Sequence, residues 1–461
     1  MDLTAADIAR VTGGVLHRGP GDARATTYAI DSRTLEPGAC FVALTAARDG
    51  HDFVADAVAR GATVALVARR LPTDVHAAVV VVDDPLVALG RLGAYAREQL
   101  EGARVVGVTG SAGKTGTKDL LAAALRGAGT VHASPGSYNN EAGVPLTLLA
   151  APAGTEAVVL EMGARAPGDI AALCAVARPT AGVITNIGMA HAGPLGGRAG
   201  IARVKGELFE ALPRGGVGVV VADADASDSV AARTAARVLH VSARATAGAD
   251  VRASSVSLDA EIRPSFTMES PWGTARVQLA VHGDHQVVNA LLAAAVALDA
   301  GVALASVVEG LESVRPAPWR MEVLRADDGV VVLHDAYNAS PSSTEAALRA
   351  LAQIDTNGRR VAVLGEMLEL GAHSEEEHRR IGRVVAALGI DVLVAVGPDA
   401  APLASAARGG DVGVEVVPDA TAALEAVLAT LGPGDAVLVK GSRAVGLEHV
   451  AQALVATERA R

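Results

Sequence analysis

One segment that reads as a strand, a glycine-rich turn and a helix constrains this chain more than any other. The turn follows an apolar run and has the form Gly107-x-x-Gly110-x-x-Gly113-Lys114-Thr115. Glycines let the backbone wrap closely around an anion, and the N–H groups that open the helix point toward phosphate oxygens. Lys114 can then neutralise the β- and γ-phosphates while Thr115 binds Mg²⁺. The segment predicts a site for ATP and Mg²⁺, and the alternative is a tight turn with an exposed lysine.

The pattern around this loop predicts an α/β protein with mostly parallel sheets, because strand-like and helical segments alternate. Short alternating runs at 250–281 predict an antiparallel flap or small sheet inside the same unit. The strand-like runs lie at 63–68, 78–83, 157–163, 181–188, 216–223, 329–335, 360–366, 391–397 and 435–441.

A chain of 461 residues is too long for a single core, so several domains are expected. New units begin near Arg104 and near Pro316. We therefore predict three domains, at 1–102, 103–315 and 316–461, with the glycine-rich loop in the central one and a doubly wound sheet in the last.

The composition argues against several classes of protein. With 51 acidic and 40 basic residues the net charge is -11, which disfavours nonspecific binding to nucleic acid or to a membrane. The start of the chain carries Asp2 and Asp7 and lacks the features of a signal peptide. The apolar stretch 287–298 is too short to span a bilayer, and Cys40 and Cys174 form no disulfide or zinc pattern. We expect a cytoplasmic enzyme.

Polar residues follow two of the central strands. Glu161 ends the run at 157–163, where a carboxylate at the carboxyl edge of a parallel sheet can bind a metal, although such a residue alone is more often a solvated strand end. His191 lies beyond the next run, in a loop shared with Asn186. It is either a packed or surface histidine or part of a second metal site.

Three further positions are ambiguous on their residues alone. Lys205 lies in a helical segment, where most lysines are solvated. His285 and Asn289 share one helix face and could bracket a planar ring, or they could be surface positions of a capped helix.

Charged and polar residues also flank the first strand of the third unit. Arg320 could reach a terminal phosphate, and Asp335 could bind a ribose hydroxyl. The alternatives are a linker charge for Arg320 and, for Asp335 and Asn338, a turn stabilised by an Asx side chain.

Taken in order, the segments of this chain resemble the Mur ligase family, whose members build the peptide of bacterial peptidoglycan one amide bond at a time. The segments that carry the resemblance are GVTGSAGKTGTK, YNNEAGVPLTLL, LEMGAR, ITNIGMAH, KGELF, the His-x-x-x-Asn pair, WRMEV and DAYNASP. The resemblance implies a UDP-binding first domain, a central ATPase and a Rossmann-like third domain.

Three stretches narrow the resemblance to the branch of the family that joins D-Ala-D-Ala to UDP-MurNAc-tripeptide (UDP-N-acetylmuramoyl-tripeptide). They are DSRTLEPGACFVAL with DGHDF, DAYNASPSS, and VAVLGEMLELG with KGSRAVGLE. The implied reaction is ADP-forming: the tripeptide carboxylate attacks ATP, and the dipeptide amine then attacks the acyl phosphate. It is the last cytoplasmic step in assembling the peptide of the peptidoglycan precursor, and nothing in the sequence requires more than a monomer.

The resemblance also implies roles for individual residues. The implied catalytic residues are Lys114, Lys205, His191, Glu161 and Asn139, and the implied metal ligands are Thr115, Glu161, His191 and, if it is carbamylated, Lys205. The implied nucleotide contacts are Gly110, Ser111, Ala112, Gly113, Lys114, Thr115, Gly116, the adenine contacts His285 and Asn289, and the phosphate and ribose contacts Arg320 and Asp335. The implied substrate contacts are Ser32 and Arg33 near the UDP-sugar, together with Asn139, Asn140 and Asn338.

The chain departs from the family pattern in places that touch no expected phosphate or metal group. Ala192 and Gly193 stand where Leu-Glu is usual after the histidine, Trp319 replaces a glycine, and Ser340 replaces an asparagine. The alternatives are therefore a paralog that uses another acceptor, such as D-Ala-D-Lac or a specialised-metabolite substrate, or a related ligase of the third-residue or folylpolyglutamate type. A nonhydrolytic nucleotide-binding scaffold and a motor or switch ATPase are the alternatives from other classes.

Overall fold

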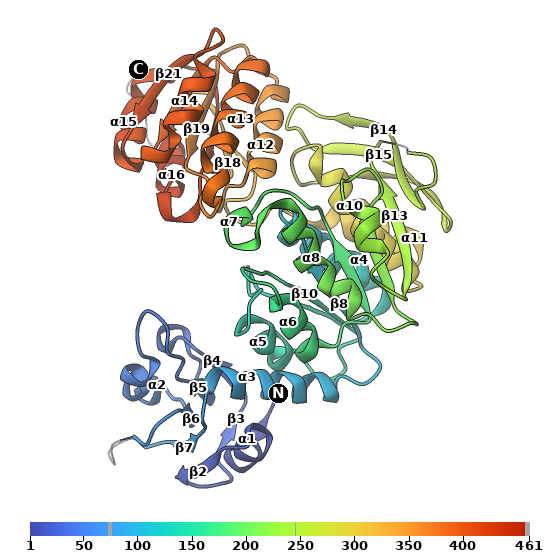
Figure 1. The fold of residues 1–461 in the computed structure, drawn as a ribbon, viewed down its shortest axis with the longest axis vertical. Coiled ribbons are helices and arrows are strands. Elements are labelled where there is room, and N and C mark those ends of the chain that lie inside the picture. The colour runs from blue at the N-terminus through green and yellow to red at the C-terminus, as the bar shows by residue number, and fades with distance from the viewer. Residues whose placement is uncertain (72–75, 245, 457–461) are drawn as a thin grey trace.

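Three α/β units follow one another along the long axis of the molecule (Figure 1). The fold is described from a computed structural model over residues 1–71, 76–244 and 246–456. Within these ranges the strands form sheets of five, nine and six strands, one per unit, and one further pair. The expected α/β class with parallel-rich sheets is confirmed.

The first unit is a five-stranded sheet in the order β2-β7-β6-β5-β4, in which only β2 is antiparallel to its neighbour. Its last helix, α3, is capped by Asp84, whose carboxylate accepts from the N–H groups of Leu86 and Val87. The elements are β1 Leu3–Thr4, α1 Ala5–Thr12, β2 Val15–Arg18, β3 Arg24–Ala25, β4 Thr27–Ala29, η1 Ser32–Thr34, β5 Ala39–Val42, η2 Gly50–Phe53, α2 Val54–Ala59, β6 Val64–Val67, β7 Ala78–Val81 and α3 Pro85–Gln99.

The central unit is built on a nine-stranded sheet in the order β16-β15-β14-β13-β12-β11-β8-β10-β9. The strands from β9 to β14 in this order pair in parallel, and β14, β15 and β16 pair antiparallel. The elements are β8 Arg104–Thr109, α4 Lys114–Leu125, η3 Arg126–Ala128, β9 Val131–Ala133, α5 Gly143–Ala150, β10 Ala157–Glu161, α6 Asp169–Ala177, β11 Ala181–Ile184, α7 Ala192–Leu195, α8 Gly197–Glu210, β12 Val217–Val221, α9 Ser227–Ala231, β13 Arg237–Ser242, β14 Val251–Leu258, β15 Pro264–Ser270, β16 Gly273–Gln278, α10 His285–Asp299 and α11 Leu304–Ser313.

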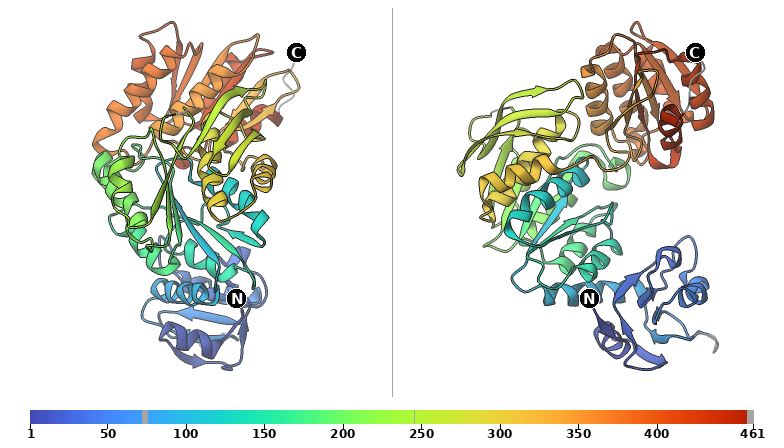
Figure 2. Two further views of the ribbon diagram at one scale, coloured as in Figure 1. Left: turned by 90° about the vertical axis from the view of Figure 1, so that its right-hand side faces the viewer. Right: turned by 180° about the vertical axis from the view of Figure 1, so that it is seen from behind.

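Helices cover both faces of this central sheet (Figure 2). Alternate residues of a strand point to opposite faces, so Val106 and Val108 pack with α4, α10 and α11, whereas Val105 packs with the helices of the other face. The apolar stretch 287–298 belongs to α10 and is almost entirely buried there. None of the described helices has the length and apolarity needed to cross a membrane.

The third unit is a six-stranded sheet in the order β17-β18-β22-β19-β20-β21, parallel except for β17. The elements are β17 Glu322–Arg325, β18 Val331–His334, α12 Pro341–Gln353, β19 Arg360–Gly365, η4 Gly371–His373, α13 Ser374–Ala387, β20 Val392–Val396, η5 Pro398–Ala400, α14 Ala401–Ala407, β21 Gly413–Val417, α15 Ala420–Thr430, β22 Ala436–Lys440, η6 Arg443–Val445 and α16 Glu448–Ala456.

The units are joined in different ways. The first unit shares a core with the central one, in which Leu89 and Leu92 of α3 lie in the same apolar cluster as Val144 and Leu148 of α5. The third unit meets the central unit through loops at the carboxyl ends of their strands, where α7 lies against η4, and Ile262 of the β14–β15 loop packs into the apolar core of the third unit. The domain boundaries at 102/103 and 315/316 remain predictions.

The segment 250–281 is antiparallel as expected, but it is not a separate small sheet. Its strand β14 pairs in parallel with β13, so the antiparallel strands extend the main sheet. Strand β13 was not expected from the sequence, because its polar residues Arg237, His240 and Ser242 hide its alternation.

Candidate functional site

The glycine-rich loop lies between β8 and α4, and α4 begins at Lys114. Gly113 immediately precedes the helix with φ of 80°, a conformation that glycine adopts without cost. A Cβ at this position would also lie 2.8 Å from Asn289 Oδ1. Lys114 Nζ donates to Gly110 O at 2.9 Å, so the side chain folds back over its own loop. The N–H groups that open α4 have no partner within the helix, so they can face an anion, and the Lys114 cation lies across the mouth of the loop.

A neighbouring strand end fixes the shape of this loop. The N–H groups of Ser111 and Ala112 both donate to Asn186 Oδ1, at 3.0 and 2.9 Å, and Thr185 Oγ1 donates to Ala112 O at 2.5 Å. Asn186 was noted in the sequence only as a neighbour of His191, and its position shows that it supports the loop.

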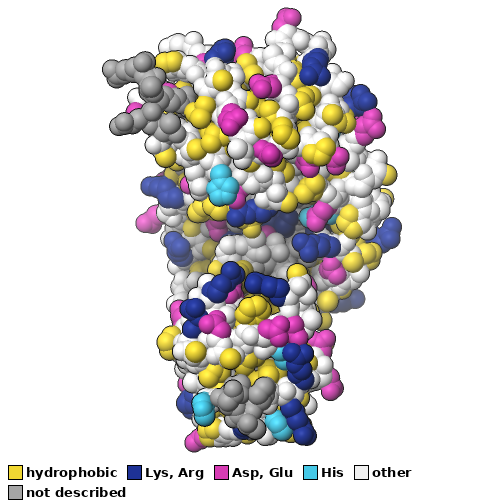
Figure 3. Space-filling model, turned by 90° about the vertical axis from the view of Figure 1, so that its left-hand side faces the viewer, with side chains coloured by type: hydrophobic (Ala, Val, Ile, Leu, Met, Phe, Trp, Pro, Cys, Tyr) yellow, Lys and Arg dark blue, Asp and Glu magenta, His cyan; other side chains and the backbone are white. Residues whose placement is uncertain are grey.

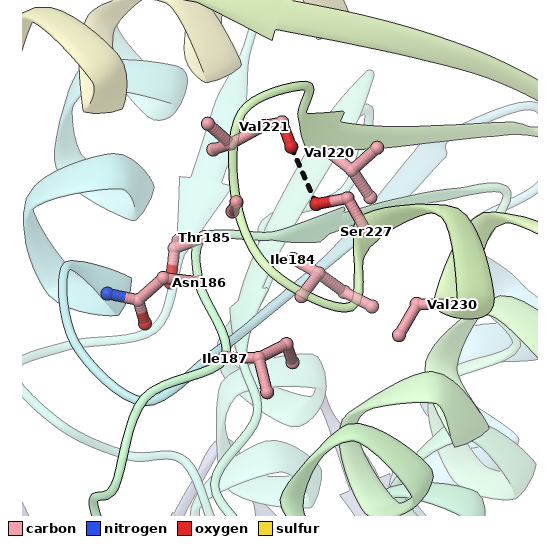
Figure 4. A pocket seen from close by; sticks show the side chains of 9 residues that line it. Ile184, Thr185, Asn186, Ile187, Val220, Val221, Ser227 and Val230 are labelled. Atoms are coloured by element: carbon pink, nitrogen blue, oxygen red, sulfur yellow. Dashed lines mark hydrogen bonds between the residues drawn. The ribbon is translucent and has the colours of Figure 1, made fainter. Parts of the chain in front are cut away.

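Behind Asn186 lies a small hollow of about 10 Å³ (Figure 4). In this view the Asn186 side chain points away from Ile184, Ile187 and Val230, which line the hollow. A space of this size holds at most one water molecule, so the hollow is a packing gap and not a substrate site.

Glu161 is the carboxylate at the centre of the site. Its side chain is 2% exposed, which rules out the solvated strand end considered above. Glu161 Oε2 accepts from Thr115 Oγ1 at 2.7 Å, and Oε1 accepts from Asn139 Nδ2 at 2.8 Å. The end of β10, the first turn of α4 and the loop before α5 therefore converge on one carboxylate.

This carboxylate and hydroxyl fit a magnesium site. Mg²⁺ in nucleotide sites is usually held by one or two protein carboxylates together with substrate phosphates and water. Among the described residues there is no cluster of three or more His, Cys, Asp or Glu that could hold a metal alone. Glu161 and Thr115 beside a phosphate loop instead match a site in which Mg²⁺ is held by one protein carboxylate together with phosphates and water.

Lys205 is buried on α8 and is not a solvated helix lysine. Its side chain is 1% exposed, and burial lowers the pKa of its ammonium to about 7, assisted by the charge of Lys114. Burial also lowers the pKa of Lys114, which Glu161 partly opposes. Two amines with lowered pKa values thus line the same cleft as the buried Glu161 carboxylate.

His191 follows β11 and precedes α7, in the left-handed region at φ 60°. Its Nδ1 contacts the carboxylate of Glu369, which belongs to the third unit. Burial lowers the pKa of the imidazole, and the nearby Glu369 charge acts in the opposite direction.

His285 and Asn289 lie at the start of α10, directly beside the loop. Asn289 is 6% exposed and accepts from Thr117 Oγ1 at 3.1 Å while donating to Gln286 Oε1 at 2.9 Å, so it is not a surface position. His285 Nδ1 is buried with no hydrogen-bond partner in the described part of the chain, and burial lowers the pKa of the ring.

The third unit contributes a second group of side chains. Arg320 stacks over the ring of Tyr337 with 4.0 Å between the guanidinium carbon and the ring centre. Both side chains donate to Ser137 Oγ of the central unit, Tyr337 Oη at 2.7 Å and Arg320 at 3.2 Å. These two side chains of the third unit therefore meet at one serine of the central unit.

Asp335 lies just beyond β18 and is held by its neighbours. Its Oδ2 forms an ion pair with Lys440 Nζ at 2.7 Å, and Oδ1 accepts from Met321 N at 3.1 Å. Lys440, the last residue of β22, also donates to the carbonyl oxygen of Asn338 at 2.8 Å.

These groups line one cleft of about 910 Å³ between the central and third units. Figure 3 shows the molecule hollowed at mid-height, with Lys and Arg side chains around the hollow. Gly110, Ser32 and Arg33 do not line the cleft. The predicted residues that line it are Ser111, Ala112, Gly113, Lys114, Thr115, Gly116, Asn139, Asn140, Glu161, His191, Lys205, His285, Asn289, Arg320, Asp335 and Asn338.

Ser32 and Arg33 lie in the first unit, apart from the cleft lining. They form η1, which begins after Asp31, and Arg33 pairs with the Asp31 carboxylate at 2.7 Å. Their role near a UDP-sugar remains a prediction.

Sequence reasoning missed several residues of the site. The cleft is also lined by Ser137, Gln286, Tyr337 and Lys440. Of these, Lys440 alone could have been suspected from the sequence, because it lies at the end of an apolar strand. Glu369 lies outside the lining and touches the site through His191 and, at 4.0 Å, through Arg165, which also lines the cleft.

Comparison with protein families gives two matches that together cover most of the chain. Residues 108–297 match the model described as the Mur ligase middle domain, and residues 319–443 match the one described as the Mur ligase, glutamate ligase domain.

Individual relatives resemble the chain along its length. A protein of Mycobacterium tuberculosis named UDP-N-acetylmuramoyl-tripeptide--D-alanyl-D-alanine ligase is 44% identical, over 99% of this chain and 98% of the relative. A crystal structure of MurF from Acinetobacter baumannii is 34% identical with a TM-score of 0.88, over 99% of both chains. That of the MurF ligase from Thermotoga maritima in complex with ADP is 29% identical with a TM-score of 0.78, over 92% of this chain and 96% of that one.

Proposed function

This chain belongs to the Mur ligase family, and from that membership we propose that it is the ATP-dependent ligase that joins D-Ala-D-Ala to UDP-MurNAc-tripeptide. The observation that carries the proposal is the single cleft in which a phosphate loop of one unit faces Arg320 and Asp335 of another. Such a cleft can hold ATP and a carboxylate substrate together and shield them from water.

ATP binds across the two units in this proposal. The N–H groups that open α4 and the Lys114 ammonium hold the β- and γ-phosphates, because both lie at the mouth of the loop. His285 and Asn289 contact adenine. Arg320 reaches the terminal phosphate and Asp335 binds a ribose hydroxyl, because both lie on the opposite wall of the cleft.

Glu161 and Thr115 would hold Mg²⁺, which would neutralise the charge of the phosphates when bound. Asn139 orients the Glu161 carboxylate through its hydrogen bond. Lys205 would join His191 as a further metal ligand after carbamylation, which converts its buried amine into a carboxylate.

The reaction then proceeds in two transfers. An oxygen of the tripeptide carboxylate attacks the γ-phosphorus, and the bond to the β-phosphate oxygen breaks, which gives ADP and an acyl phosphate. The neutral amine of D-Ala-D-Ala attacks the acyl carbon, the tetrahedral intermediate expels phosphate, and the amine loses a proton. Lys114 and Arg320 stabilise the transferring group by position and charge.

The remaining substrate contacts follow the same proposal. Asn140 and Asn338 line the cleft near the reacting ends, and Ser32 and Arg33 hold the UDP end in the first unit. The enzyme acts as a monomer in the cytoplasm, where ATP and nucleotide-linked precursors are available.

Phosphate release from ATP and Mg²⁺ tests the proposal, with the two substrates added singly and together. We expect release only when both are present, with UDP-MurNAc-pentapeptide detected by mass and no release by Lys114→Ala. Release without either substrate would identify a switch or motor ATPase. Nucleotide binding without release would identify a scaffold or a paralog with another acceptor, which D-Ala-D-Lac in place of the dipeptide would test.

A further inference from the structure

Two strained residues meet at the boundary between the central and third units. His191 and Glu369 are both non-glycine residues with positive φ, 60° and 63°, and the His191 ring contacts the Glu369 carboxylate. A non-glycine residue in the left-handed region raises the free energy of the folded state, so it persists only where the surrounding structure holds its backbone there, often at a functional site. Both partners of this one contact are strained, which indicates that the contact has a function.

The backbones on either side of this contact are packed directly against each other. Gly193 N donates to Glu369 O at 3.2 Å. A Cβ on Gly193 would lie 2.9 Å from Gly371 N and 3.0 Å from Gly371 Cα, so only two glycines allow this approach. Gly193 is one of the positions at which the chain departs from the usual Leu-Glu, and the close packing gives that departure a physical reason.

The loop that carries Glu369 is fixed within the third unit. Met367 N donates to His378 Nε2 at 3.0 Å, and Leu368 N donates to Ser442 Oγ at 3.0 Å. The Glu369 side chain itself is 44% exposed and lies outside the cleft lining. The loop therefore holds one carboxylate oxygen of Glu369 against His191, while the Arg165 guanidinium lies 4.0 Å from the other oxygen.

We propose that Glu369 is a positioning residue in the third unit. By fixing the His191 ring, it makes the metal-binding part of the ATP site depend on docking of the third unit against the central one. With Nδ1 turned to Glu369, Nε2 is the nitrogen left to face a cation in the cleft. A carboxylate that holds the second nitrogen of a ligating histidine sets its tautomer and orientation. The inference rests on the proposed function for His191.

The test measures cation binding as well as catalysis. Mn²⁺ binding, followed by electron paramagnetic resonance with a nonhydrolysable ATP analogue present, is compared for the wild type, Glu369→Gln and Glu369→Ala. We expect Glu369→Ala to bind Mn²⁺ about 10- to 100-fold more weakly. Glu369→Gln retains an acceptor for the ring N–H and should fall between the two. Unchanged or tighter binding by Glu369→Ala would overturn the inference, because Glu369 would then be idle or would compete with the cation for His191.

A double-mutant comparison separates positioning from general damage. If Glu369 acts through His191, Glu369→Ala should cause no further loss of Mn²⁺ affinity in a His191→Ala background. Additive losses would contradict the inference. Glu376→Ala is the matched control, because Glu376 lies on α13 of the same unit and pairs with Arg383 on the surface.

A second pair of variants tests the glycine contact. Gly193→Ala should weaken Mn²⁺ binding, since its Cβ would force the units apart. Gly215→Ala should not, because a Cβ there meets no atom of the described residues within 4 Å. Equal Mn²⁺ affinities of the two variants would show that close docking of the two units is not needed for cation binding. The binding readout keeps this test apart from the proposed function, because a wild type that binds Mn²⁺ and the analogue without releasing phosphate would refute only the ligase reaction.

Discussion

Lys205 shows how burial changes what a side chain can do. Its pKa of about 7 in the folded protein lies below the ordinary value for lysine, and burial is the main cause. Above about pH 7 the folded protein releases this proton while the unfolded chain still binds it, so this group makes the free energy of unfolding rise with pH up to lysine's ordinary pKa. Below about pH 7 both states are protonated, and the full cost of the buried charge remains.

The same lowered pKa predicts that Lys205 reacts with carbon dioxide, because the neutral amine is the reactive form. In ¹³C-bicarbonate we expect a carbamate signal by nuclear magnetic resonance that is stronger at about pH 8 than at about pH 6. The signal should be missing from Lys205→Arg, which cannot lose its proton. A signal of equal strength in that variant would place the adduct on another amine.

At the scale of residues, the sequence predicted those site residues whose place at the end of a strand indicates their function. Glu161 and His191 follow strand ends of a parallel sheet, and the structure brings both to the cleft. Lys205 could not be singled out from its residues, because only tertiary packing buries it. Glu369 could not be found at all, since its partner lies in another unit and far away in sequence.

At the scale of elements, two adjacent parallel strands end in a buried ion pair. Asp335 follows β18 and Lys440 ends β22, and neither side chain has much contact with solvent. The pair fixes the carboxylate expected to bind ribose, which explains a buried lysine at the end of an otherwise apolar strand.

Breaking this pair from one side should be costly. We expect Lys440→Met to lower the free energy of unfolding by about 3–5 kcal/mol in urea denaturation, because it leaves a buried carboxylate without its partner. The double variant Lys440→Met with Asp335→Asn should lose less than the sum of the single losses, since no charge is stranded. Simple additivity would show that the two charges do not depend on each other.

The elements themselves were predicted where their patterns were strong. Continuous apolar runs gave β6, β10, β11, β18, β19 and β22, because strands buried on both faces need apolar residues throughout. β13 was missed because polar residues interrupt it. The joining of β14 to the main sheet was missed because pairing partners are a tertiary property.

At the scale of the whole molecule, Ser137 ties the central and third units together. Its hydroxyl receives hydrogen bonds from Tyr337 and Arg320, and both partners belong to the third unit. No local sequence pattern around Ser137 indicates this role, so the arrangement of the units could not be predicted from the sequence.

Removing this hydroxyl should loosen the cleft. For Ser137→Ala we expect a KM for ATP raised about tenfold, which corresponds to two lost hydrogen bonds of ordinary strength. The radius of gyration by small-angle X-ray scattering should increase as the units separate. Ser229→Ala is the control, because the hydroxyl of that exposed serine donates to Ala226 O within its own turn. No change in either quantity would show that Ser137 is not needed for docking.

The central claim is that the cleft activates a carboxylate as an acyl phosphate and shields it from water. Tripeptide substrate labelled with ¹⁸O in its terminal carboxylate tests this claim most directly, with the released phosphate analysed by mass spectrometry. Because a carboxylate oxygen attacks phosphorus and leaves with it, we predict one ¹⁸O in each phosphate formed with D-Ala-D-Ala present, and one ¹⁸O kept in the new amide. Unlabelled phosphate would mean that water attacks ATP, and it would contradict the account.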